Sequence, residues 1–450
     1  MRYWLLERLD EFEENIAIIW QEQQYTYKQL SEQVVKWQHE LSNYDIWAGE
    51  SVALHGDYSF KTCTLLLALI ANRNIVVPLT SLVPEKKAKF LEIARVGAIF
   101  EFSNNDTWSF NRRKINDRQP LLDHLRIQGE SGLVLFTSGS TGESKAVLLS
   151  FDKILEKFKE RRPQLRTLAF LLLDHIGGIN TLLHILSNGG TVISIDERSP
   201  QSVCRAIEQY RVQLLPTTPT FLNMLLISEA YKHYDLSSLE LITYGTEPMP
   251  ISTLEYLNKV LPWVRLKQTY GLSELGIPQT QSRNSNSLWV KVGGEGFETK
   301  VVKGNLWIRA KSAMLGYLNA PSPFDEAGWF NTGDAVEVDG EYIRILGRTS
   351  EIINVGGEKV YPAEVESVLL QMDNIRDATV RGQANPVTGN VVVATVNLFE
   401  PEEPRSIERR MREFCKDRLA AYKIPVFLEI SKEKQYSDRF KRMRNKYRAV

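Results

Sequence analysis

Apolar runs alternate with amphipathic stretches along the first three quarters of the chain. Residues 27–41 and 200–211 carry apolar side chains at three- and four-residue spacing, which predicts amphipathic helices. Five short apolar runs between the helical stretches are predicted as buried strands, at residues 75–79, 97–102, 133–138, 191–195 and 239–245. Helices that alternate with buried strands are typical of an α/β fold with largely parallel sheets.

The pattern changes after residue 290. Residues 290–310 hold short strand-like runs with turn glycines, and residues 335–348 form two alternating runs around Asp339-Gly340, which predicts a hairpin. A further unit then follows, with predicted helices at 362–372 and 405–420 and strands at 378–383 and 390–399. We therefore predict an α/β chain with a large N-terminal domain of sheet–helix subdomains and a small β-rich subdomain, plus a C-terminal α+β domain. The predicted limits are 1–348 for the first domain, 349–351 for a hinge and 352–450 for the second domain.

Composition excludes several classes of protein. The 450 residues include 55 Lys+Arg and 55 Asp+Glu, so no net charge favours binding to nucleic acid, and no apolar run approaches the roughly 18 residues of a membrane span. The three cysteines are odd in number and widely spaced, and the first residues are charged, so we expect a cytoplasmic protein without disulfides. The six histidines lack the spacing of a zinc site.

The strongest chemical signal is the segment from Leu135 to Lys145, in which a buried strand runs into a loop of glycines and hydroxyl side chains. Glycines allow backbone N–H groups to converge on an anion, and hydroxyls and a lysine add donors and charge for phosphate. The spacing is not that of a Walker A loop, and a surface loop without a ligand is the alternative. The candidate phosphate ligands are Thr137, Ser138, Gly139, Ser140, Thr141, Gly142 and Lys145.

This segment resembles the phosphate loop of the adenylate-forming superfamily, which includes acyl- and aryl-CoA ligases, peptide-synthetase adenylation domains and luciferases. The resemblance implies that ATP and Mg²⁺ activate a carboxylic acid as an acyl-adenylate. It also implies that a mobile C-terminal domain then rotates, so that a thiol of CoA or phosphopantetheine can take the acyl group.

Two more segments carry the resemblance. Residues 268–274 are similar to the YGxTE motif, with Ser273 in place of threonine, which implies that Tyr270 stacks on adenine and that Glu274 holds Mg²⁺. Residues 328–334 are similar to the GWxxTGD motif, which implies that Asp334 binds the ribose hydroxyls, although an aspartate that caps a turn is the alternative. The segment 244–248 resembles the other wall of the adenine site. The ATP-binding residues that these segments imply are Gly245, Thr246, Glu247, Thr269, Tyr270, Gly271, Ser273, Asp334 and Arg348.

The C-terminal domain carries the residues that the resemblance implies for the domain movement. Ser350 falls at the hinge position, and Gly356 and Gly357 match the glycines beside the thiol channel. The motif PxTxxGKxxR is matched by residues 435–444, which implies that Lys441 acts at the reacting carboxylate and α-phosphate, with Lys446 as the alternative. Gln435 and Phe440 replace the proline and the glycine of that motif.

The acyl pocket is implied around His175, because residues 171–178 resemble the acyl-CoA ligase segment in which a histidine precedes a glycine. If this stretch is a strand, Asp174 and His175 face opposite ways and only one can enter the pocket. Plausible wall residues are Phe221, Tyr244, Gly245 and Gly271.

The leading hypothesis is therefore an acyl- or aryl-CoA ligase, with Lys441, Glu274 and His175 as the implied catalytic residues. The chain length and the compact region 290–317 are similar to bacterial o-succinylbenzoate–CoA ligases. One alternative is a ligase that loads the phosphopantetheine arm of an acyl carrier protein. Another is a non-catalytic nucleotide-binding scaffold, suggested by the changed lysine motif.

Overall fold

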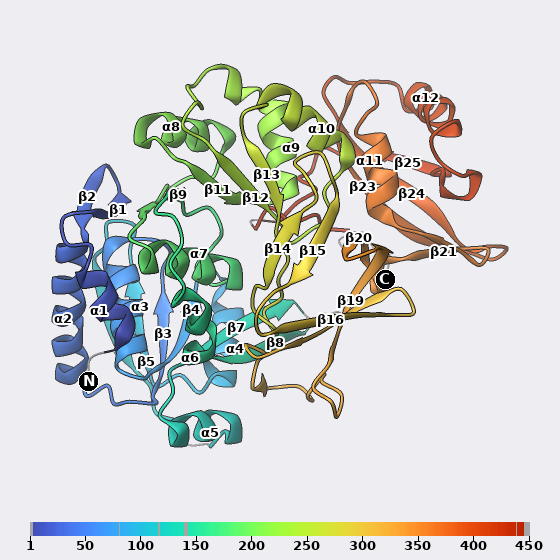
Figure 1. Cartoon of the computed structure of the whole chain (residues 1–450). Coiled ribbons are helices and arrows are strands. Elements are labelled where there is room, and N and C mark those ends of the chain that lie inside the picture. Colours follow the sequence, from blue (N-terminus) through green and yellow to red (C-terminus); the bar gives the residue numbers. More distant parts are fainter. Residues whose placement is uncertain (1–2, 81, 116–117, 139–142, 438, 445–450) are drawn as a thin grey trace.

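The computed structural model describes residues 3–80, 82–115, 118–138, 143–437 and 439–444, without the side chain of Ser138. Within these ranges the chain forms four β-sheets (Figure 1). Three belong to a large N-terminal part, and the fourth belongs to a smaller C-terminal part. The predicted α/β class with its β-rich subdomain and C-terminal α+β unit is confirmed.

The first sheet has the strand order β18-β8-β7-β4-β3-β5-β6. Its inner strands β7, β4, β3 and β5 run parallel, while β6, β8 and β18 are antiparallel to their neighbours. The bounds are β3 Ser51–His55, β4 Ile75–Leu79, β5 Ala98–Phe102, β6 Trp108–Arg112, β7 Gly132–Ser138, β8 Ser144–Ser150 and β18 Gly316–Tyr317. Strands β7 and β8 carry the two ends of the predicted phosphate segment, Thr137 and Lys145.

The second sheet has the order β13-β12-β11-β9-β10-β1-β2, and only the pair β1–β2 is antiparallel. Its strands are β1 Ile16–Trp20, β2 Gln23–Thr26, β9 Arg166–Leu168, β10 Thr191–Ile193, β11 Leu214–Thr217, β12 Leu241–Tyr244 and β13 Arg265–Gln268. Because parallel strands end on the same edge, the segments after β9, β11, β12 and β13 are brought together there.

Helices cover these two sheets. Helix α3 is apolar along its length and buried, as expected for a helix enclosed between layers, and α2 begins at a capping box formed by Thr26 and Gln29. The helices of the large part are α1 Trp4–Asp10, α2 Tyr27–Asn43, α3 Phe60–Ala71, α4 Pro84–Ile93, α5 Pro120–Gln128, α6 Phe151–Leu155, α7 Ile176–Ser187, α8 Pro200–Tyr210, α9 Pro219–Ser228 and α10 Ile251–Val260. No helix in the described ranges is long and apolar enough to span a bilayer.

The third sheet is antiparallel and has the order β14-β15-β20-β19-β17-β16. Its strands are β14 Gln279–Ser282, β15 Trp289–Gly293, β16 Phe297–Val302, β17 Asn305–Ala310, β19 Phe330–Asp339 and β20 Tyr342–Arg348. The Asp339-Gly340 turn joins β19 to β20, as the alternating pattern predicts.

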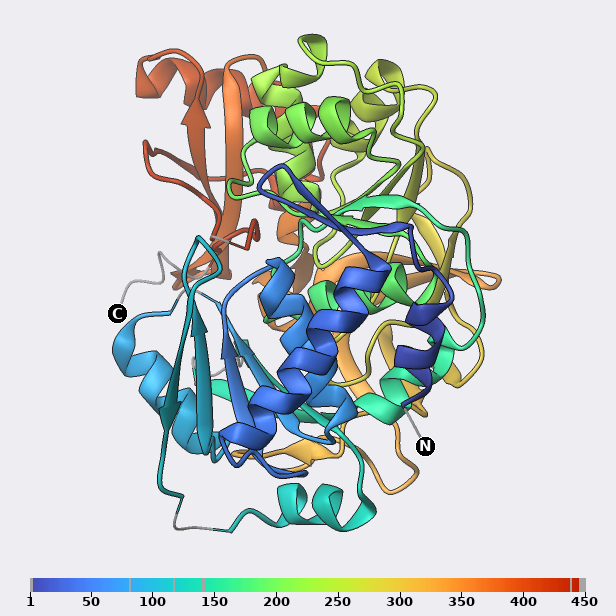
Figure 2. The ribbon, with the colours of Figure 1, turned by 90° about the vertical axis from the view of Figure 1, so that its left-hand side faces the viewer.

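The fourth sheet follows the 3₁₀ turn Thr349–Glu351, in which the predicted hinge residue Ser350 lies. It has the order β22-β21-β24-β23, with β25 paired to β24. Its elements are β21 Ile353–Val355, β22 Glu358–Val360, α11 Pro362–Leu369, β23 Ile375–Asn385, β24 Gly389–Leu398, α12 Pro404–Lys416 and β25 Phe427–Ile430. Figure 2 shows this unit, in orange and red, beside the green helices of the second sheet and above the blue first sheet.

Candidate active site

A cleft of about 1910 Å³ opens where the three sheets of the large part meet residues 434–437 and 439–444. Elements that are far apart in sequence contribute to it, and most of the predicted site residues line it. They are Thr137, Lys145, His175, Thr246, Glu247, Thr269, Tyr270, Gly271, Ser273, Glu274, Asp334, Arg348, Ser350 and Lys441. The phosphate-loop strand and the predicted adenine, ribose and lysine residues therefore share one cavity.

Three predicted glycines do not line the cleft. A Cβ on Gly245 would lie 2.6 Å from Thr269 Oγ1, so Gly245 allows the ends of β12 and β13 to pack closely. Gly356 and Gly357 form the turn between β21 and β22, both with positive φ. The predicted residues Gly139, Ser140, Thr141, Gly142 and Lys446 lie outside the described residues, as does the side chain of Ser138.

The predicted phosphate side of the cleft is built on strands β7 and β8, in which Thr137 pairs with Lys145. The Lys145 Nζ lies 5.0 Å from the ring centroid of Tyr317, and the Tyr317 hydroxyl donates to Glu274 Oε1 at 2.9 Å. Burial, and then the Glu274 charge, raise the pKa of Tyr317, which keeps the phenol protonated as a donor. Tyr317 thus connects the predicted phosphate lysine to the predicted metal carboxylate.

Sequence analysis did not identify Tyr317, because a Gly-Tyr pair on a two-residue strand carries no recognisable chemistry. No cluster of three acidic, histidine or cysteine side chains suited to a metal occurs in the described part of the chain. A site with a single carboxylate nevertheless suits Mg²⁺, which keeps several waters and uses substrate phosphates as further ligands.

The opposite side of the cleft is organised around Asp334, which is buried on β19. The Tyr270 hydroxyl donates to Asp334 Oδ2 at 2.5 Å, and Arg348 Nε lies 3.1 Å from Asp334 Oδ1. Burial raises the pKa of Asp334, although Arg348 opposes the shift. A carboxylate offers about four acceptor sites, so both oxygens can still accept from ribose hydroxyls.

His175 lies at the start of α7, where Gly177 N–H donates to its Nδ1 at 3.1 Å. Burial, and then the charges of Lys441 and Arg439, hold the pKa of His175 well below 6.5. The ring is therefore neutral, and because Nδ1 accepts a hydrogen bond, its proton lies on Nε2.

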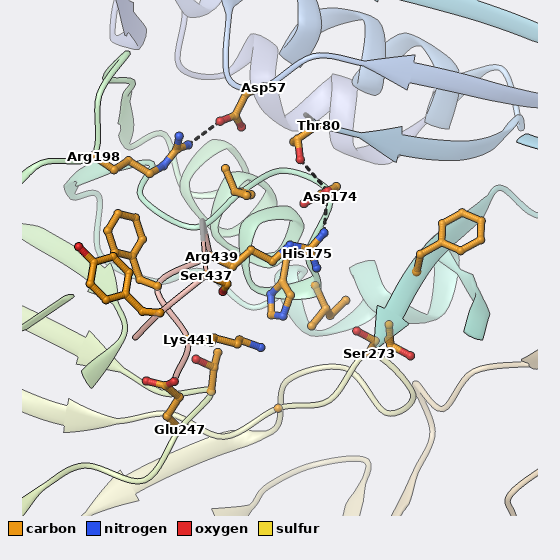
Figure 3. A pocket seen from close by; sticks show the side chains of 18 of the residues that line it. Asp57, Thr80, Asp174, His175, Arg198, Glu247, Ser273, Ser437, Arg439 and Lys441 are labelled. Carbon is orange, nitrogen blue, oxygen red and sulfur yellow. Dashed lines mark hydrogen bonds and ion pairs between the residues drawn. The ribbon is translucent and has the colours of Figure 1, made fainter. Parts of the chain in front are cut away.

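The stretch around His175 is a turn and not a strand, so the condition under which only one of Asp174 and His175 could enter the pocket is not met. Both side chains line the cleft. Asp174 is buried, and its Oδ2 accepts from Thr80 Oγ1 at 2.7 Å and from Arg439 Nη2 at 2.8 Å (Figure 3). Sequence alone could not pair Asp174 with Arg439, because 265 positions separate them.

Lys441 reaches the cleft because the segment that carries it binds to the large part. Thr218 Oγ1 donates to the Phe440 carbonyl at 2.9 Å, and the Arg442 N–H donates to Glu247 Oε1 at 2.5 Å. Figure 3 shows Lys441 between Glu247 and His175. The carboxylate of Glu247, predicted for ATP, also accepts from Thr220 Oγ1 at 2.6 Å, so both of its oxygens contact protein groups.

Electrostatics at Lys441 are unusual. Burial lowers the pKa of Lys441 to about 8; Glu247 opposes this shift, whereas Arg439 and Arg348 add to it. A lysine in these surroundings is still mostly charged at neutral pH, but it loses its proton more easily than a lysine in water.

An ion-pair cluster fixes the end of the described chain to the small part. Arg444 forms a bidentate ion pair with Glu366, in which Nε donates to Oε1 at 2.8 Å and Nη2 donates to Oε2 at 2.6 Å. The Arg444 Nη1 lies 2.8 Å from Glu351 Oε2. Burial disfavours the Glu366 charge, but Arg444 and Arg442 outweigh it and lower the pKa of Glu366. The glutamate at position 366 therefore holds the segment from which Lys441 projects.

Two family models match the chain, one described as AMP-binding enzyme over residues 5–318 and one as AMP-binding enzyme C-terminal domain over residues 364–438. A 2-succinylbenzoate–CoA ligase of Bacillus cytotoxicus is 28% identical over 458 residues, covering 94% of this chain and 93% of the relative. An indoleacetate–CoA ligase of Aromatoleum aromaticum is 32% identical over 327 residues, covering 66% of this chain and 63% of the relative.

Solved structures have the same fold. The o-succinylbenzoate CoA synthetase of Bacillus subtilis in complex with its acyl-adenylate superposes with a TM-score of 0.79 at 22% identity, covering 100% of this chain and 98% of that chain. The anthranilate CoA ligase AuaEII in complex with anthranoyl-AMP gives a TM-score of 0.81 at 20% identity, with coverage of 96% and 94%.

Proposed function

Because the chain belongs to the AMP-binding enzyme family of adenylate-forming enzymes, we propose that it is an acid–thiol ligase that activates an aromatic carboxylic acid with ATP and transfers the acyl group to CoA. The observation that carries this proposal is the convergence of Lys145, Glu274, Asp334 and Lys441 on one cleft. The acid class is supported by relatives named for 2-succinylbenzoate and indoleacetate, and by Phe170, which lines a small cavity beside His175 and Lys441.

In the first half-reaction, a carboxylate oxygen of the acid attacks the α-phosphorus of ATP. The bond from that phosphorus to the bridging oxygen breaks, and pyrophosphate leaves. Lys145 and the hydroxyls of the β7–β8 loop are proposed to hold the phosphates, and Asp334 with Arg348 the ribose.

Glu274, held by Tyr317, is the residue proposed to bind Mg²⁺ together with phosphate oxygens and water. The ion would supply neutralisation of the phosphate charge.

Lys441 is proposed to neutralise the charge that develops at the α-phosphate, because its ammonium enters the cleft beside His175. The neutral His175, with its proton on Nε2, can donate a hydrogen bond to a carboxylate oxygen of the acid. In the second half-reaction the thiol sulfur attacks the carbonyl carbon of the adenylate, the bond from that carbon to the phosphate oxygen breaks, AMP leaves, and the thiol proton passes to solvent.

The thiolation pose requires that the small part rotates about Ser350, so that Gly356 and Gly357 replace Lys441 at the cleft. Our proposal includes this hinge and the limits at residues 348 and 352. Lys441 lines the cleft, which argues against the non-catalytic scaffold, because that alternative depends on the loss of the lysine.

The test is acid-dependent ATP–pyrophosphate exchange over a panel of aromatic and aliphatic acids, followed by thioester analysis with CoA and with an acyl carrier protein in parallel. We expect exchange with at least one aromatic acid, a CoA thioester, and a strong loss of exchange in Lys441→Ala. Absence of exchange across the whole panel contradicts the proposed activity. Exchange with thioester formed only on the carrier contradicts CoA as the acceptor.

A further inference from the structure

Phe440 has a backbone conformation that is unfavourable for its residue type. Its φ of +51° lies in the left-handed region, which favours glycine, and it replaces the glycine of the motif that precedes the lysine. Strain of this kind persists where surrounding contacts impose it, often at functional sites. The contacts of the Phe440 side chain are therefore informative.

The ring of Phe440 crosses from the small part into the large part. Its centroid lies 5.2 Å from that of Phe170, which follows β9, and 5.6 Å from that of Phe221 in α9. Both of these aromatic side chains are buried. The ring of Tyr436 lies nearly parallel to that of Phe440, with centroids 6.0 Å apart, and Thr218 Oγ1 donates to the Phe440 carbonyl.

The ring also bounds a small cavity next to the reactive groups. This cavity holds about 20 Å³ of free space, roughly the room that one water molecule needs. Its lining includes His175 and Lys441, the groups that the proposed function places at the carboxylate of the acid, together with Phe170 and Phe440. Phe440 therefore bounds the free space next to His175 and Lys441, together with Phe170 of the large part.

We propose that Phe440 is a specificity-determining residue that closes the end of the acyl pocket, so that only compact acids are adenylated. This inference rests on the proposed function, because it takes Lys441 and His175 as the groups that meet the carboxylate. The side chain leaves the pocket when the small part rotates, so the size limit applies to adenylation and not to the thiolation step. The enzyme then selects acids by size only while the small part holds Lys441 in the cleft.

The experiment compares wild type, Phe440→Gly and Phe440→Ala with a series of acids of increasing length: benzoate, phenylacetate, 3-phenylpropanoate and 4-phenylbutanoate. Adenylation is measured as kcat/KM for the acid in pyrophosphate exchange. Thiolation is measured as thioester formation from the presynthesised acyl-adenylates. Phe399→Ala is the matched control, because Phe399 is an exposed aromatic residue of the same small part.

We expect both Phe440 variants to raise the kcat/KM ratio of the longest to the shortest acid by at least about tenfold, since one methylene in an apolar pocket changes discrimination by about that factor. Phe399→Ala should leave the ratio unchanged, and wild type should discriminate by length in exchange but not in thiolation. An equal loss for every acid in the Phe440 variants would overturn the proposal, because the ring would then only hold the lysine segment. Wild-type thiolation that discriminates as strongly as exchange would also overturn it. An unchanged length preference in active Phe440 variants would overturn the role given to Phe440 alone. If wild type exchanges with no acid of any kind, the proposed function itself has failed.

Discussion

The lowered pKa of Lys441 predicts that adenylation slows at alkaline pH and that the thiolation half-reaction does not share this limit. The charged form of this lysine is the form proposed to act, and burial places its pKa at about 8. The cation is therefore lost as the pH rises through that value, and activity should fall on the alkaline side. His175 does not contribute to this limb, because its pKa is held well below 6.5.

The size of the effect follows from the fraction of Lys441 that carries its proton. With a pKa near 8, about nine-tenths of the lysine is charged at pH 7 and about one-tenth at pH 9, which predicts a roughly tenfold fall in kcat/KM between them. An arginine at this position stays charged across the range. Lys441→Arg should thus be slower overall but should lose the alkaline limb.

The assay is initial-rate pyrophosphate exchange as a function of pH, with kcat/KM for the acid as the measured quantity, because this ratio reports the free enzyme. Lys434→Arg is the matched control, since Lys434 lines the same cleft outside the segment that carries Lys441. It should keep the wild-type profile. A wild-type rate that does not fall between pH 7 and 9, or a fall with the same midpoint in Lys441→Arg, would refute the reasoning.

Three further predictions concern the groups that hold the cleft together. Tyr317→Phe removes the hydroxyl that donates to Glu274, and we expect the Mg²⁺ concentration for half-maximal exchange to rise by about tenfold or more; an unchanged Mg²⁺ titration would contradict the role given to Tyr317. Asp334→Asn should raise KM for ATP by about 10- to 100-fold through loss of charged hydrogen bonds, whereas Asp339→Asn on the exposed hairpin should not, and equal effects of the two would argue against ribose binding. Arg444→Met leaves the buried Glu366 without its two-pronged partner, so urea denaturation should show a loss of about 3 kcal/mol, at the lower end for a broken buried pair because Arg442 remains nearby; a loss below about 1 kcal/mol would show that the pair is not needed for stability.

Most of the fold follows from local pattern. The apolar run at Ile75 forms β4 over the predicted residues, and the Asp339-Gly340 turn lies between β19 and β20. Both signals are local, since burial of an apolar run and the turn preference of Asp-Gly depend on a few neighbouring residues.

Contacts between distant segments could not be predicted in the same way. Sequence analysis left open whether the stretch that ends at His175 is a strand, and in the structure His175 caps α7. The contacts of Arg439 with Asp174 and of Phe440 with Phe170 join segments that only the assembled fold brings together. Motif resemblance identified residues that line the cleft, whereas the side chains that orient them, such as Tyr317, had no signal of their own.

The binding of the terminal segment in the cleft has a stoichiometric consequence. Lys441 and the Gly356-Gly357 turn are carried by the same small part, and only Lys441 lines the cleft in this pose. In the proposed mechanism one chain therefore cannot serve both half-reactions at the same moment, and we expect the adenylate to stay beneath the segment until an acceptor arrives. With acid and ATP but no thiol, each functional chain should release one pyrophosphate rapidly and then stall, so the amplitude of that first burst counts the active molecules in a preparation.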